Sequence, residues 1–130
     1  MTSDSVVFIL VLLGLFCHFS ACSWVLVTEA TLDAAEPSWI EAQDLFTQSS
    51  GDVYIASLYF IVQTMTTVGY GDISSSNLNE FVLNIFLKLA GVVLFSFVQS
   101  FILKMVEEKK QIQSIIDSKM ATLTRLQDNY

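Results

Sequence analysis

The chain has 130 residues, of which 53% are hydrophobic and 15% are charged, and its net charge at pH 7 is -7. This composition is far more apolar than that of a water-soluble domain of the same length, so it predicts a protein that resides in a lipid bilayer. The negative charge argues against nucleic acid as a partner, because its phosphates would be repelled.

The first predicted element is an outer transmembrane helix over residues 6–27, a run without a formal charge. It would be about 33 Å long, which is enough to cross a bilayer. A cleaved signal peptide is the competing interpretation, but the run is too long and lacks a basic leader. His18 lies inside the run, and we expect it to hydrogen-bond to the pore helix or to backbone rather than to bind a ligand. Trp24 suits an aromatic anchor at the membrane interface.

Residues 28–52 are polar, and we expect them to form an aqueous turret. The segment contains no Lys or Arg, and its acidic residues are Glu29, Asp33, Glu36, Glu41, Asp44 and Asp52. A short helix is predicted to start within Glu36–Trp39, because Pro is tolerated in a first turn and acidic side chains favour the positive end of a helix dipole. The acidic residues form either a rim that concentrates cations or simply a solvated loop, and both interpretations stay open.

Residues 53–66 are apolar and compatible with a helix, but at about 21 Å such a helix is too short to cross a membrane. We expect it to enter the bilayer and turn back, as a pore helix. Such backbone is stable at membrane depth only where protein or a water-filled cavity satisfies its polar groups. The C-terminal end of the helix, near Thr66, would direct its partial negative charge toward the pore centre and favour a cation there.

A glycine-containing run follows the predicted pore helix, and its five residues are Thr67, Val68, Gly69, Tyr70 and Gly71. Uncharged backbone carbonyls can replace the water around a potassium ion without trapping the ion. Successive carbonyls can point to one axis only if some residues adopt left-handed conformations, which Gly69 and Gly71 do at little cost. We therefore predict a selectivity filter over residues 67–71, with K⁺ bound at its first four residues. Thr66 and Asp72 flank the filter, and a Gly- and Thr-rich turn between two strands is the weaker alternative.

Residues 80–106 form the second apolar run, which is long enough for a tilted inner transmembrane helix. Gly91 is its one glycine, and it is either a hinge for gating or a point of close packing. Phe95 and Gln99 lie one turn apart and share a face. Lys88 lies on much the same face, where a charge is costly unless the side chain snorkels or pairs, and we expect it to pair with an acidic residue near the outer mouth.

The chain is expected to return to water between Asp72 and Glu80. Five of the six basic residues lie at or beyond the end of the second apolar run, so the positive-inside rule places the C-terminal end in the cytoplasm and the turret outside the cell. In residues 107–130 apolar side chains recur at steps of three, four and seven, which is typical of an amphipathic helix that needs a partner. Both a coiled coil and helix-turn-helix packing fit this pattern.

The whole chain resembles the pore module of the potassium-channel superfamily, most closely the branch that carries cyclic-nucleotide-binding-type domains, with ether-a-go-go, plant and ciliate channels. Residues 17–24 carry the branch's His, Ala-Cys and Trp, residues 54–60 are similar to its pore helices, and the stretch after Lys104 is similar to the start of its C-linker. The resemblance implies an all-α membrane fold with two transmembrane helices, a re-entrant pore helix and a filter loop in a tetrameric pore. It also implies that Phe95 and Gln99 line the cavity, although the branch usually has a hydrophobic residue at the second position.

These features predict a multi-pass plasma-membrane protein that conducts K⁺ passively as a homotetramer, or with related channel subunits. Residues 1–106 would be the pore domain and residues 107–130 a C-linker-like helix. A potassium transporter subunit and a non-conducting modulatory subunit are the alternatives. We expect no enzyme activity and no cofactor other than the permeant ion, because His18 is the only histidine and no nucleophile pairs with a base. With no voltage-sensing helix before Val6 and no nucleotide-binding domain after Tyr130, we expect a fragment of a longer channel.

Overall fold

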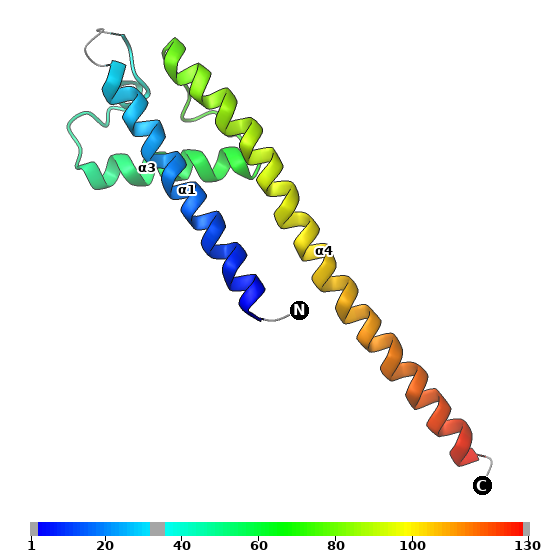
Figure 1. Cartoon of the computed structure of the whole chain (residues 1–130). Helices are drawn as coiled ribbons and strands as arrows, with labels where there is room; N and C mark the ends of the chain where they lie inside the picture. The colour runs from blue at the N-terminus through cyan, green and yellow to red at the C-terminus, as the bar shows by residue number, and fades with distance from the viewer. Residues whose placement is uncertain (1–2, 32–35, 129–130) are drawn as a thin grey trace.

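The computed structural model describes residues 3–31 and 36–128, and the regular secondary structure in these ranges is helical. The helices are α1 (Ser3–Thr31), α2 (Trp39–Ala42), α3 (Ser50–Met65) and α4 (Leu78–Asp128). The short α3 lies across the long α1 and α4 and contacts both (Figure 1). Segments Val6–Ala30 and Leu78–Gln127 are long and apolar enough to cross a membrane. The prediction of an all-α fold, with two long apolar helices and a short helix between them, is confirmed.

Local hydrogen bonds determine where the two short helices begin. Ser38 precedes α2, and its side chain accepts a hydrogen bond from the Glu41 amide at 3.3 Å. Ser49 and Asp52 form a reciprocal capping box at the start of α3, in which each side chain accepts a hydrogen bond from the other residue's amide. Because this box satisfies amides that have no partner inside the helix, α3 begins at Ser50, three residues before the predicted pore helix.

The predicted inner helix and the cytoplasmic segment form one helix, α4, of 51 residues. No proline occurs in this range, and its single glycine, Gly91, lies within the helix. Over the described residues α4 therefore has no helix-turn-helix break, and it extends well past the N-terminal end of α1 (Figure 1). Several large apolar side chains on this extension are exposed, namely Ile112, Ile115, Ile116, Met120, Leu123 and Leu126.

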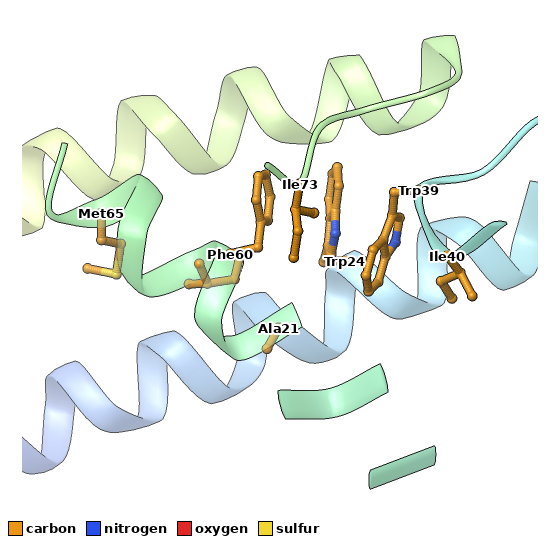
Figure 2. Close-up of a cluster of buried hydrophobic side chains, with 8 residues drawn as sticks. Ala21, Trp24, Trp39, Ile40, Phe60, Met65 and Ile73 are labelled. Atoms are coloured by element: carbon orange, nitrogen blue, oxygen red, sulfur yellow. The ribbon is translucent and has the colours of Figure 1, made fainter. Parts of the chain in front are cut away.

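A stack of aromatic rings forms the core where α1 ends and α4 begins. Trp24 of α1 lies between Phe60 of α3 and Trp39 of α2, with ring centroids 4.6 Å and 6.0 Å apart (Figure 2). Both indoles are 0% exposed. The prediction of Trp24 as an interfacial anchor is therefore wrong, because the turret folds back over the end of α1 and covers the ring.

Two side chains of α1 tie it to α3 through polar contacts. The His18 Nδ1 atom lies 2.8 Å from the hydroxyl oxygen of Tyr54, so the predicted hydrogen bond between His18 and the pore helix is confirmed. Cys17 and Ala21 are four residues apart, which is about one turn of helix, so they lie on one side of α1. Both pack into the hydrophobic core, to which α3 contributes. The Cys17 thiol lies 3.5 Å from the sulfur of Met65. These contacts hold α3 in a defined position against α1.

Glu80 is fully buried, so the expectation that it marks a return to water is wrong. Its carboxylate accepts hydrogen bonds from the Ser76 amide at 2.7 Å, the Thr28 hydroxyl at 3.1 Å and the Trp39 amide at 3.2 Å. The Asn77 side chain in turn accepts a hydrogen bond from the Glu80 amide at 2.9 Å. Glu80 therefore joins α1, the turret and the loop before α4, and these contacts hold the C-terminal end of the loop that carries the predicted filter.

Candidate ion-conducting site

The predicted filter residues lie in the loop between α3 and α4 and are exposed in a single chain. Gly69 and Gly71 have positive φ angles of 57° and 79°, which is the backbone conformation that the predicted filter requires of them. Thr67 also has a positive φ, 60°, which is uncommon for a β-branched residue. Left-handed backbone thus recurs at every second residue. The sequence pattern indicated only the two glycines, because no local propensity marks a threonine for this conformation.

Three consecutive amides of this loop donate hydrogen bonds to one residue of α3, Gln63. Its carbonyl oxygen accepts from the amides of Val68 and Gly69 at 3.0 and 3.3 Å, and its side-chain oxygen accepts from the Tyr70 amide at 3.1 Å. In a planar trans peptide the N–H and the C=O point in opposite directions, and the described chain has no cis peptide. The carbonyls of Thr67, Val68 and Gly69 therefore all point away from Gln63.

Asp72 connects the end of the predicted filter to α3 and to the turret. Its carboxylate accepts hydrogen bonds from the Tyr59 hydroxyl at 2.7 Å and from the Gln63 side-chain amide at 3.0 Å, and its carbonyl accepts from the Gln43 side chain at 2.7 Å. The hydrogen bond from Tyr59, followed by that from Gln63, lowers the pKa of Asp72 below its usual range. Because the pKa is lowered in the folded state, this stabilisation is complete at neutral pH and is lost only as the pH falls through the lowered value.

We expect Tyr59→Phe to reduce K⁺ flux through reconstituted protein, because it removes one of the two side-chain donors that hold the Asp72 carboxylate. Both groups reach solvent in a single chain, so the expected reduction is modest, about two- to fivefold. Tyr54→Phe is the matched control, since Tyr54 is also on α3 but hydrogen-bonds to His18 and not to the loop. Equal reductions in the two variants would show that the Tyr59–Asp72 bond has no special role.

The other predicted site residues lie on α4. Phe95 is half-buried and Gln99 is exposed. Lys88 is exposed on much the same side of the helix, and within the described part of a single chain it makes no ion pair. The pairing that we expected between Lys88 and an acidic residue is therefore not made among the residues that the structure describes in one chain. Leu87, Leu94 and Val98 are half-buried on the side that faces the other helices.

Gly91 lies where α4 crosses the C-terminal end of α3. It is buried, and a Cβ atom placed on it would be 3.4 Å from both the Cα and the Cγ of Met65. This is a close approach of two helices, of the kind that a small residue permits. The geometry supports close packing at this position, and a hinge at Gly91 remains a prediction.

Substitutions at Gly91 distinguish packing from hinge motion. We expect Gly91→Ala to be tolerated, because one methyl group fits at contact distance and alanine favours a helix. Gly91→Val should destabilise the fold by about 1–3 kcal/mol, since its extra methyl groups overlap Met65. Gly14 is the control position, because nothing lies within 4 Å of a Cβ there. Thermal unfolding and K⁺ flux are measured for the Ala and Val variants at Gly91 and at Gly14. A Gly91→Ala protein with normal stability but no K⁺ flux would indicate a hinge at Gly91 instead of close packing.

Comparison with known proteins agrees with a fold of two long apolar helices with a short helix between them. A family model described as ion transport protein matches residues 1–114. The chain belongs to the ion transport protein family. This membership also places it among transport proteins rather than enzymes.

Potassium channels are among the relatives of this ion transport chain. It is 39% identical over 66 residues to potassium channel AKT2/3 of Arabidopsis thaliana, covering 50% of the chain and 8% of that protein. It is 24% identical over 98 residues to potassium voltage-gated channel unc-103 of Caenorhabditis elegans, covering 64% of the chain and 12% of that protein. It is 23% identical over 126 residues to voltage-gated delayed rectifier potassium channel KCNH4 of Rattus norvegicus, covering 85% of the chain and 12% of that protein.

The resemblance to the branch of plant and ether-a-go-go-type channels is confirmed by these matches. The ion transport chain spans about a tenth of the length of these curated relatives.

Sequence reasoning missed three of the residues that hold the loop from behind, which are Gln43, Gln63 and Glu80. Gln63 is only 5% exposed although it is polar and lies in an apolar helix. A buried polar side chain needs hydrogen-bond partners, so an isolated Gln five residues before Val68 was the available signal.

Proposed function

We propose that this chain is the pore-forming segment of a potassium-selective channel that conducts K⁺ passively across a membrane. The observation that carries the proposal is the set of three amides that donate to Gln63. With these N–H groups held against α3, the carbonyl oxygens of Thr67, Val68 and Gly69 are free on the opposite side to replace the water around an ion. Potassium is the expected ion because the curated relatives are potassium channels by name.

A single chain offers only one wall of such a pore, so the proposal includes a fourfold assembly. Each chain would supply a quarter of the oxygens around every K⁺, at Thr67, Val68, Gly69 and Tyr70, and cyclic symmetry would close the ring. The exposure of the loop in one chain is consistent with this arrangement. Phe95 and Gln99 would line the cavity below the filter, since they lie on one face of α4.

The proposed setting is the plasma membrane, with the turret outside the cell and the end of α4 in the cytoplasm. The two long apolar helices support the membrane setting. Five of the six basic residues lie at or beyond Lys104, and this distribution supports the orientation. The turret acids Glu36, Glu41 and Asp44 are exposed, as either a cation-concentrating rim or a solvated loop requires.

Reconstitution into lipid vesicles tests the proposal directly. The purified chain should admit K⁺ much faster than Na⁺, and single-channel currents should exceed the rate of any carrier cycle. Its mass in detergent or lipid should be that of a tetramer. A stable monomer, or equal K⁺ and Na⁺ flux, would contradict the proposal. A tetramer without current that reduces the current of a full-length channel would instead favour a modulatory subunit.

A further inference from the structure

A cavity of about 470 Å³ lies between the C-terminal half of α1, the turret and the first turn of α3. It adjoins the hydrophobic core, since Ile40 belongs to both, and none of residues 67–71 lines it. Most of its wall is apolar and comes from all three segments, through Val25, Leu26, Ile40, Leu45, Phe46 and Val53. A volume of this size can hold a small-molecule ligand.

The polar groups of the cavity are acidic or neutral. Glu29 on the last turn of α1 lines it, together with Gln48 and Ser50 at the start of α3. The sequence contains no Lys or Arg before Lys88, so no lysine or arginine from the first 87 residues can neutralise Glu29. The turret next to the cavity carries two further exposed acids, Glu41 and Asp44. The electrostatic potential at this cavity therefore favours a cation and repels a carboxylate or a phosphate.

We propose that this cavity binds a single-chain amphiphilic amine that has partitioned into the bilayer. Its ammonium group would lie at Glu29, near the membrane surface, and its apolar chain would lie between Leu45 and Phe46 of the turret and Val53 of α3. A phospholipid fits less well, because its phosphate would face the Glu29 carboxylate. The second apolar cavity, between α1 and α4, has about 270 Å³ and only apolar lining residues, so it has no group that selects by charge. The proposal rests on the membrane setting of the proposed function and not on conduction.

Cys22 offers a direct reporter, because it lines the cavity and is half-buried. In a Cys17→Ala background, its alkylation rate by N-ethylmaleimide can be measured with the protein in lipid discs. Dodecyltrimethylammonium should slow this rate in a saturable manner. Dodecanol and dodecanoate have the same chain length, and at equal membrane concentration we expect them to bind about fivefold or more weakly, because they lack the positive charge.

Two variants separate charge recognition from simple partitioning. Glu29→Gln should remove most of the preference for the ammonium compound, whereas Glu41→Gln should reduce it only slightly, because Glu41 is an exposed acid near the cavity that does not line it. Val53→Phe should weaken protection by all three compounds, since its ring would fill the space. Equal protection by the cation and the anion, or an unchanged preference in Glu29→Gln, would overturn the proposal.

Protection that does not saturate would overturn the cavity itself as a binding site. K⁺ flux measured on the same samples keeps the two proposals distinguishable. A sample that conducts but shows no protection refutes only the amine site, and a protected sample that does not conduct refutes only the channel.

Discussion

Gly69→Ala is expected to abolish potassium selectivity or current altogether. Gly69 has a φ of 57°, and no atom lies within 4 Å of the position that its Cβ would take in a single chain. The effect therefore comes from the backbone and not from a collision inside the chain. A left-handed conformation costs an alanine about 1–2 kcal/mol, so four chains would store about 4–8 kcal/mol of strain in one filter. Relaxation of this strain would turn the amide of Gly69 or Tyr70 away from Gln63 and misdirect a carbonyl.

The ratio of K⁺ to Na⁺ flux in vesicles measures this effect. Gly51→Ala is the matched control, because Gly51 lies in the first turn of α3, where its φ is not positive and a Cβ would make only one ordinary contact, at 3.5 Å. The control should keep both its flux and its selectivity. If Gly69→Ala retained the parent ratio, residues 67–71 would not be the selectivity filter.

Glu80→Ala should cause the largest loss of stability of any single substitution considered for this chain. It would leave two donors without their acceptor, the amides of Trp39 and Ser76, whereas the Thr28 hydroxyl would keep its hydrogen bond to the Trp24 carbonyl at 3.3 Å. A buried donor without a partner costs about 1–3 kcal/mol, so the loss of the acceptor for two amides is expected to decrease the free energy of unfolding by about 2–6 kcal/mol. Glu80→Gln should recover part of this loss, because the side-chain oxygen of Gln can still accept hydrogen bonds. Recovery should be incomplete, since the NH₂ group of Gln cannot accept and would face another donor.

Equilibrium unfolding in mixed detergent micelles measures the free energy of unfolding of each variant. Size-exclusion chromatography shows whether each variant still assembles. Glu107→Ala removes an exposed acid from the same helix and should change the free energy of unfolding by less than about 0.5 kcal/mol. A Glu80→Ala protein as stable as the Glu107→Ala protein would show that the buried carboxylate does not hold the turret to α4.

Features that depend on neighbours in the sequence could be predicted without the structure. The lengths of the apolar runs determine which helices can span a bilayer, and this requirement does not depend on how the helices pack. The left-handed backbone at Gly69 and Gly71 was predictable for a related reason, since glycine adopts it at little cost wherever the residue is placed. Likewise, the contact between His18 and α3 follows from the cost of an unpaired polar group inside an apolar span.

The conformation of Thr67 could not be predicted in this way. Its side chain disfavours a positive φ, and the hydrogen bonds that hold the next amides to Gln63 become evident only once α3 and the loop lie together. The continuity of the inner helix with the cytoplasmic segment could, by contrast, be predicted, because a change of composition near Val106 does not end a helix. α4 continues because no proline or second glycine interrupts it.

By itself, the sequence determined the membrane class, the order of the helices and the position of the candidate filter, because these follow from hydrophobic length and from backbone freedom at single residues. The tertiary structure alone decided the environment of the polar and aromatic side chains. Trp24 and Glu80 both suggest a membrane surface when read locally, but each is 0% exposed because the turret folds over the end of α1. Burial depends on segments far apart in the chain, and no local pattern records which of them will meet.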